Sequence, residues 1–222
     1  MKPGLFVAGT GTNVGKTVLS AALMHRYRDD VSVRYWKPVQ TGFPEDDDTA
    51  EVRRLGSCSD AEIFDSGIRL PRPLSPHLSA ELSGATIDMR ALAATLSAGK
   101  GWVVEGAGGV LVPLNQSDLM IDLIRLLGLA AVVMARSALG TINHTLLTLE
   151  ALRSRRIPVA GVVMGGELNP DNRRAIEMYG RVSVLGEMPR FPDLSSTVLR
   201  EWACAELDRG SCLRPFLAGD SE

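Results

Sequence analysis

The chain has 222 residues, of which 45% are hydrophobic and 5% aromatic, and its formal net charge is −2. This length and composition suit one large α/β domain or two small ones, and the near-neutral charge excludes the strongly basic surface typical of nucleic-acid binding. Three scattered cysteines without metal-ligand spacing favour a reducing compartment over a disulfide framework.

Short apolar runs alternate with longer segments of helical periodicity along most of the chain. We predict strands over residues 5–8, 31–36, 102–105, 130–135, 159–164 and 182–185. We predict helices over residues 17–28, 87–98, 118–127, 141–153, 169–179 and 194–207, with Asp118 as a cap of the third. The proline-rich segment 39–77 is predicted to be irregular, apart from a short helix that the acidic run 45–48 opens and that ends at residue 55.

Strands that alternate with helices indicate βαβ units, and therefore a mainly parallel sheet covered by helices on both faces. The sequence shows no low-complexity linker and no internal repeat, so we predict a single domain over residues 1–222. Ligands of such sheets bind beyond the carboxyl ends of the strands. We expect several informative residues to meet at that edge: the loop after Ala8, Lys37, Glu105, Arg136, Gly165 and Pro189.

No membrane span is expected, because the longest apolar run, residues 126–135, is far shorter than the ~20 residues that a span needs. The chain also enters its first strand without a signal-peptide pattern. We therefore expect a cytoplasmic protein with no membrane partner.

The most specific motif is a phosphate-binding loop with the sequence GTGTNVGKT at residues 9–17. It stands between a predicted strand and a predicted helix, which is the context that such a loop requires. Its backbone N–H groups and the helix N-terminus attract phosphate oxygens. Lys16 is expected to reach the β- and γ-phosphates and Thr17 to ligate Mg²⁺. The loop is a variant, because Thr10 stands where the strict pattern has its first glycine; the alternative is a turn with a chance Lys-Thr pair.

Lys37 ends the second predicted strand and precedes Pro38, which holds its neighbour extended. We expect Lys37 to project toward the phosphate site, where a cation neutralises charge that develops during phosphoryl transfer. Thr41 follows on the same turn as a hydrogen-bond donor to substrate. The alternative for Lys37 is a solvated lysine at a strand end.

Two groups of carboxylates are candidates for a metal site. Asp46, Asp47 and Asp48 offer the oxygen ligands that Mg²⁺ prefers, and the alternative is a solvated loop that caps a helix. Glu105 ends a valine-rich strand, where a carboxylate must be paired or bound to metal. This is where P-loop NTPases place a metal-associated acid; the alternative is a structural ion pair. The three histidines lack zinc-ligand spacing, and we assign them no catalysis.

Six segments together resemble the dethiobiotin synthetases, the ATP-dependent carboxylases of biotin synthesis. They occur in family order and span nearly the whole chain: residues 9–17, 37–42, 75–77, 104–109, 139–144 and 186–189. The resemblance implies a P-loop NTPase-like fold, a homodimer with the site at its interface, and Mg²⁺ with ATP as co-substrate. It implies that 7,8-diaminononanoate and CO₂ form a carbamate, that ATP phosphorylates it, and that the neighbouring amine closes a cyclic urea.

The resemblance also implies roles for individual residues. Lys37 and Lys16 are the implied catalytic residues, and Mg²⁺ is held by Thr17, Glu105 and an acid of the 46–48 run, Asp48 by best register. Substrate contacts are implied for Thr12, Lys37 and Thr41, and for Asn143 from the partner subunit. The implied nucleotide site comprises Asn13, Val14, Gly15, Lys16, Thr17, Val18, Asp48, Glu105, Gly106, Ala107, Gly108, Gly165, Gly166, Pro189, Arg190 and Phe191.

The chain departs from the family pattern at two places. Asn13 stands where a glutamate is frequent, so that one acidic contact near the metal is missing. Gly165 and Gly166 stand where an asparagine that reads the adenine is common. Because glycine has no side chain to read a base, we expect loose discrimination between ATP and other nucleoside triphosphates.

Two other classes of P-loop protein are alternatives. Enzymes of cobyrinic acid amidation need a glutaminase domain, for which 222 residues leave no room. ParA/MinD-like positioning ATPases carry a lysine five residues before Lys16, where this chain has Gly11, and often a membrane-binding amphipathic tail. We expect the C-terminal residues 214–219 to be too short for such a tail.

Overall fold

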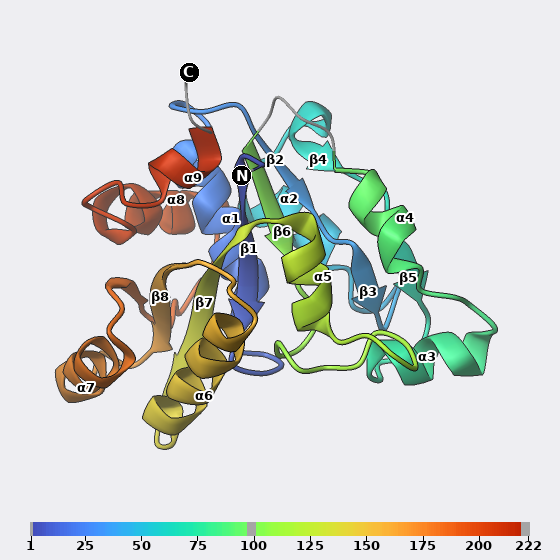
Figure 1. Ribbon diagram of the computed structural model, residues 1–222. Helices are drawn as coiled ribbons and strands as arrows, with labels where there is room; N and C mark the ends of the chain where they lie inside the picture. The colour runs from blue at the N-terminus through green and yellow to red at the C-terminus, as the bar shows by residue number, and fades with distance from the viewer. Residues whose placement is uncertain (1, 97–100, 219–222) are drawn as a thin grey trace.

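The central element of the fold is a parallel sheet of seven strands in the order β4–β2–β6–β1–β7–β8–β9 (Figure 1). The computed structural model describes residues 2–96 and 101–218. The strands are buried because helices cover both faces, which explains their valine- and alanine-rich sequences. Their bounds are β1 Gly4–Gly9, β2 Val33–Trp36, β4 Ile63–Phe64, β6 Gly101–Glu105, β7 Ala130–Ser137, β8 Val159–Gly166 and β9 Val184–Met188.

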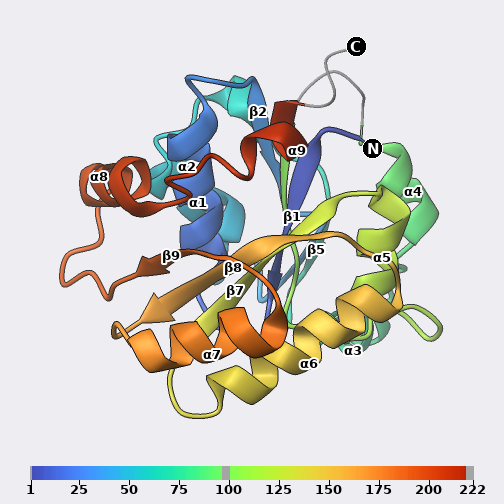
Figure 2. The same cartoon turned by 60° about the vertical axis from the view of Figure 1, so that its left-hand side comes forward.

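Helices form a layer on each face of this sheet (Figure 2). One layer comprises α1 (Lys16–Tyr27), α2 (Asp48–Leu55), α8 (Ser196–Glu206) and α9 (Arg214–Ala218). The other comprises α4 (Met89–Ala94), α5 (Met120–Leu127), α6 (Thr141–Ser154) and α7 (Pro170–Gly180), with α3 (Pro76–Ser83) at its end. Each layer closes its own apolar core against the sheet. The predicted α/β class with a mainly parallel sheet is thereby confirmed.

Among the described helices, none combines the length and hydropathy needed to cross a bilayer.

The segment 39–77 is more regular than its sequence predicts. It contains β3 (Val39–Thr41) and β5 (Ile68–Leu70), which pair as a separate two-stranded parallel sheet. It also contains a 3₁₀ turn, η1 (Asp60–Glu62), and the edge strand β4, and α3 begins at its end. The expectation of an irregular segment is wrong here, because strands of two or three residues are too short to show alternation and depend on partners distant in sequence.

Several predicted helices differ from the structure at their ends, and two of these differences are informative. The helix predicted over 118–127 begins at Met120, and its N-terminus is satisfied by Asp122, which accepts the Leu119 N–H at 3.0 Å. The expectation that Asp118 caps this helix is therefore wrong; its side chain accepts from Asn115 instead. The helix predicted over 87–98 is α4, Met89–Ala94, and residues 97–98 of that prediction lie outside the described residues.

The seven parallel strands end at one edge of the sheet, as the sequence predicts. The loop after β1, Lys37 after β2 and Glu105 at the end of β6 lie on three adjacent strands. Arg136, Gly165 and Pro189 occupy the corresponding ends of β7, β8 and β9. The candidate site is built on this edge because parallel pairing leaves every strand's carboxyl end on the same side.

Candidate functional site

The phosphate-binding loop joins β1 directly to α1. Gly15 has φ 107°, and Asn13 has φ 56°, which lies in the left-handed region that asparagine enters more readily than most residues. That backbone geometry is a physical reason for asparagine at position 13. The Lys16 Nζ donates to the Gly11 carbonyl at 2.9 Å, so that its ammonium lies back over the loop. Arg136 from β7 donates to the Asn13 carbonyl at 2.9 Å.

A cavity of about 300 Å³ lies against this loop and collects most of the predicted site residues. It is lined by Thr12, Asn13, Gly15, Lys16, Thr17, Val18, Lys37, Gln40, Thr41, Asp46, Asp48, Glu105, Ala107 and Gly108. Val14 and Gly106 belong to the same loops but are not among its lining residues. We call this space the phosphate cavity.

Lys37 is buried in the phosphate cavity between two carboxylates. Its Nζ lies 2.6 Å from Asp48 Oδ2 and 2.8 Å from Glu105 Oε1, and it also donates to the Gly106 carbonyl at 3.2 Å. The side chains of Lys37 and Glu105 are 3% and 1% exposed. The interpretation of Lys37 as a solvated strand-end lysine is therefore wrong, because its buried ammonium is held in the site by the buried Glu105 and the partly exposed Asp48.

Thr17 joins the same group of oxygen atoms. Its Oγ1 lies 2.7 Å from Asp48 Oδ1 and 3.0 Å from Glu105 Oε1. A hydroxyl and two carboxylates are the hard oxygen donors that suit Mg²⁺, which uses few protein ligands and keeps water and phosphate oxygens as the rest. Among residues 2–96 and 101–218, no group of three or more histidine, cysteine or acidic side chains could hold a metal.

The three consecutive aspartates have different surroundings. The Asp47 carboxylate caps α2 by accepting the Ala50 N–H at 3.0 Å. Asp46 is held through its backbone carbonyl, which accepts from Gln40 Nε2 at 2.7 Å. The Asp48 carboxylate faces Thr17 and Lys37. The geometry therefore favours Asp48 among the three as the acid of the site.

Sequence reasoning missed three buried polar residues around the acids. Gln40 holds the start of α2, since its Oε1 also accepts the Asp48 N–H at 3.2 Å. Ser20 and Tyr35 donate to Glu105 Oε2 at 2.9 and 3.0 Å. Ser20 had a signal, because it follows Lys16 by four residues on one helix face. Tyr35 and Gln40 had none beyond their proximity to Lys37.

The charges of the phosphate cavity shift one another's pKa values. Burial opposes the charged form of Lys37, but the carboxylates of Glu105 and Asp48 outweigh it and raise the pKa of Lys37. Burial likewise opposes ionised Asp48, and Lys37 and Thr17 more than compensate, so the pKa of Asp48 is lowered. Lys16 differs: burial, with repulsion from Lys37, lowers its pKa to about 8, because the same carboxylates compensate only in part.

The predicted base-binding residues lie at the same sheet edge but outside the phosphate cavity. Gly165 and Gly166 end β8, and Pro189, Arg190 and Phe191 follow β9. A Cβ atom built on Gly165 would lie 2.3 Å from the Met134 Cε, so that Met134 occupies the space that a larger side chain needs. Any contact of this strand end with a base therefore depends on backbone groups.

Asn143 also lies apart from the phosphate cavity, in the first turn of α6. A second cavity, of about 320 Å³, separates that helix from the phosphate loop and shares Thr12 with the phosphate cavity. Its lining includes Val110, Leu111, His144 and Leu147. Within one chain, the structure does not bring Asn143 to Lys37.

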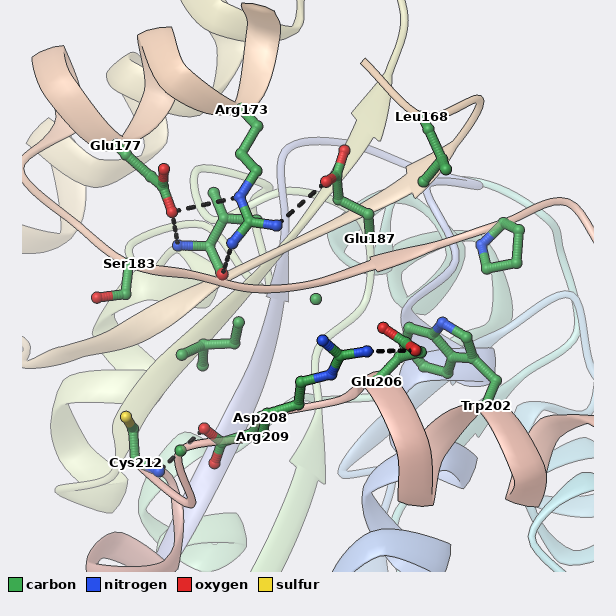
Figure 3. Close-up of a pocket in the computed structure, with 15 residues that line it drawn as sticks. Leu168, Arg173, Glu177, Ser183, Glu187, Trp202, Glu206, Asp208, Arg209 and Cys212 are labelled. Carbon is green, nitrogen blue, oxygen red and sulfur yellow. Dashed lines mark hydrogen bonds and ion pairs between the residues drawn. The ribbon is translucent and has the colours of Figure 1, made fainter. Parts of the chain in front are cut away.

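A third cavity, of about 710 Å³, lies on the outer side of β9 (Figure 3). Arg173 on α7 reaches Glu187 of β9 at 3.2 Å, lies 3.5 Å from Glu177 on its own helix, and donates to the Val184 carbonyl. These ionic contacts cover the backbone of the edge strand β9. The cavity shares Pro189 with the predicted base site but no residue of the phosphate loop.

The fold and the phosphate cavity are those of a P-loop NTPase-like protein. Solved structures with this fold include a ParA family ATPase from Chlorobium tepidum TLS, which is 9% identical with a TM-score of 0.55 and covers 91% of this chain and 97% of that one. The signal recognition particle receptor FtsY from Elizabethkingia anophelis is 11% identical with a TM-score of 0.52 and covers 92% and 66%. At these identities the likeness concerns the fold alone.

Sequence relatives specify the family. A family model described as an AAA domain matches residues 3–198. ATP-dependent dethiobiotin synthetase BioD from Paramagnetospirillum magneticum is 50% identical over 196 residues, covering 88% of this chain and 92% of that protein. BioD from Brucella ovis is 48% identical over 198 residues, with coverages of 88% and 90%. The chain therefore belongs to the ATP-dependent dethiobiotin synthetase family of ligases, as its motifs predict.

The lowered pKa of Lys16 predicts a pH dependence of nucleotide binding. Without ligand, Lys16 loses its proton as the pH rises through about 8. Since Lys16 attracts a triphosphate only in its ammonium form, binding must then take up a proton, and the observed affinity should fall by up to about tenfold per pH unit above that value. Calorimetric titration with ATP in two buffers of different ionisation enthalpy measures this uptake.

At pH 7 the proton uptake measured by calorimetry should be near zero, because Lys16 is already protonated there. A Lys16→Arg variant should show no such decline, whatever its absolute affinity, because a guanidinium stays charged throughout this range. Binding at about pH 9 without proton uptake in the unmodified protein would contradict the lowered pKa.

Proposed function

We propose that this chain is an ATP-dependent dethiobiotin synthetase that converts 7,8-diaminononanoate, CO₂ and ATP into dethiobiotin, ADP and phosphate. Two lysine ammonium groups in one cavity beside a P-loop, Lys16 and Lys37, carry this proposal. Membership of the family supports it, because the relatives named synthetases match almost the whole of their own length.

The chemistry requires activation of a poor electrophile. One amine of the substrate adds to CO₂ and loses a proton, which gives a carbamate. A carbamate oxygen attacks the γ-phosphorus and ADP leaves, which gives a carbamic–phosphoric mixed anhydride. The neighbouring amine then attacks the carbamoyl carbon, phosphate leaves, and the ureido ring closes. Carbamate and triphosphate are both anionic, so the site must bring two anions together.

The side chains of the phosphate cavity suit this task. Lys16 supplies positive charge beside the phosphate loop, and Lys37 supplies it beside the two acids. Both charges reduce the repulsion between the carbamate and the triphosphate. Thr41 and Thr12 line the same cavity and are suited to hydrogen bonding with the diamine and its carbamate. Before ligands bind, the two lysines are balanced by Asp48 and Glu105, so that additional positive charge is needed for the incoming anions.

Mg²⁺ is the cation that fits this requirement. Thr17, Asp48 and Glu105 would hold it through their oxygen atoms. When bound, it supplies positive charge to the β- and γ-phosphates. The remaining nucleotide contacts are proposed for the backbone of the phosphate loop, for residues 106–108, for Gly165 and Gly166 at the end of β8, and for residues 189–191 after β9.

A homodimer would complete the substrate site. Leu111 and Leu147 line the second cavity, beside the phosphate cavity, and are 53% and 55% exposed. Clustered leucines exposed next to a functional site are typical of an interface. A second copy seated there would bring Asn143 of the partner subunit toward the carboxylate end of the diamine.

Product formation tests the proposed activity. Purified protein with ATP, Mg²⁺, bicarbonate and 7,8-diaminononanoate should give dethiobiotin by mass spectrometry, with ADP formation that depends on the diamine. A Lys37→Met variant keeps a long side chain without the charge, and its turnover should fall by at least about a hundredfold, the scale of one electrostatic group in a transition state. Hydrolysis of ATP that ignores the diamine would overturn the assignment; normal turnover by the variant would overturn the role of Lys37.

The glycines at the end of β8 predict weak selectivity for the base. With Met134 against Gly165 and no side chain at position 165, adenine and cytosine should be accepted with comparable kcat/KM. The measurement is kcat/KM with ATP and with CTP at saturating diamine. A strong preference for ATP would contradict this prediction.

The proposed interface predicts that a charged side chain introduced there dissociates the dimer. A Leu147→Asp variant should shift the protein from dimer to monomer in sedimentation experiments and reduce turnover, because each active site needs both copies. Leu82→Asp is the matched control, since Leu82 is 48% exposed on α3, away from the second cavity. An unmodified protein that is monomeric and fully active would contradict the shared site.

A further inference from the structure

The two oxygen atoms of Glu105 have separate sets of donors. Lys37 Nζ and Thr17 Oγ1 approach Oε1 at 2.8 and 3.0 Å, and both residues line the phosphate cavity. Tyr35 Oη and Ser20 Oγ approach Oε2 at 3.0 and 2.9 Å. Tyr35 and Ser20 are fully buried and are not among the cavity's lining residues. One oxygen therefore faces the site and the other faces the protein interior.

The hydroxyl protons around Glu105 are not equally available to it. A hydroxyl has one proton to donate. Ser20 Oγ has two acceptors within reach, the Lys16 carbonyl and Glu105 Oε2, both at 2.9 Å. Thr17 Oγ1 likewise lies between Asp48 and Glu105. The Tyr35 hydroxyl, in contrast, donates to Glu105 Oε2. Its proton is therefore not shared with a second acceptor.

Tyr35 is well placed to hold that oxygen rigidly. It lies in β2, paired with Ile63 of β4 on one side and Val103 of β6 on the other. Its ring packs in the core beneath α1 and α2. Burial and the charge of Glu105 raise the pKa of Tyr35 well above its usual value, so the hydroxyl keeps its proton.

We propose that Tyr35 is a positioning residue for the metal site. Its hydroxyl holds Oε2 of Glu105 and thereby turns Oε1 toward Thr17 and Lys37, where Glu105 would hold the divalent cation. This role rests on the proposed function, in which Glu105 is a metal ligand. Without the Tyr35 hydroxyl, Oε2 of Glu105 keeps only the shared Ser20 proton, and the carboxylate gains rotational freedom. The cation must then order the carboxylate on binding, which weakens its affinity.

A substitution that removes one oxygen atom tests this role. Tyr35→Phe keeps the ring in the core, and Tyr179→Phe, at a side chain 67% exposed on α7, is the matched control. Mn²⁺ binding in the presence of a non-hydrolysable ATP analogue is followed by electron paramagnetic resonance. Tyr35→Phe should weaken Mn²⁺ binding by about tenfold, the usual effect of losing a partner of a metal ligand. Its affinity for the analogue without metal should stay the same, and raised Mg²⁺ should restore kcat.

The outcomes separate this role from a merely structural one and from the proposed function. A loss of thermal stability with unchanged Mn²⁺ affinity would overturn the positioning role. Ser20→Ala should weaken Mn²⁺ binding less than Tyr35→Phe, because its proton is shared; a larger effect would assign the role to Ser20 instead. If the unmodified protein binds no Mn²⁺ with the analogue and forms no dethiobiotin, the proposed function fails, whereas normal behaviour of all variants overturns the role of Tyr35 alone.

Discussion

The site depends on one buried ion group, the ammonium of Lys37 between the carboxylates of Asp48 and Glu105. Charges removed from water are costly unless each is paired and hydrogen-bonded. Glu105 satisfies this condition with Thr17, Ser20 and Tyr35 as further donors. Asp48 satisfies it with Thr17. The phosphate loop, β2, β6 and α2 are therefore connected through side chains as well as through the sheet.

This ion group also explains the division of roles between the two lysines. Lys37 is stabilised as a cation because it contacts both acids, whereas Lys16 lies over the loop and contacts a backbone carbonyl. The same two carboxylates thus raise the pKa of Lys37 and only partly offset the effect of burial on Lys16. A phosphate that approaches Lys16 supplies the direct anionic contact that this lysine does not make in the free protein. Lys37 needs no ligand to remain charged.

Much of the fold and part of the site were predictable from local sequence. The apolar run 5–8, the loop at 9–17 and the following helix form one continuous strand–loop–helix unit, so short-range rules suffice there. The same rules fail for β3, β4 and β5, whose few residues are strands only because distant partners hydrogen-bond to them. They also fail for Tyr35 and Gln40, since the contacts that make these residues important are made by side chains across the fold.

The sequence by itself determined the class of the sheet, the phosphate loop and the types of chemical group at the strand ends. Those features depend on backbone periodicity and on motifs of a few neighbouring residues. Only the tertiary structure decided which acid of the 46–48 run meets Thr17, and that Lys37 is buried against Glu105. Thr17 lies 31 residues from Asp48, and Lys37 lies 68 residues from Glu105. Distances between such residues are set by how helices and strands pack, and a hydrogen bond tolerates only a few tenths of an ångström of error in that packing.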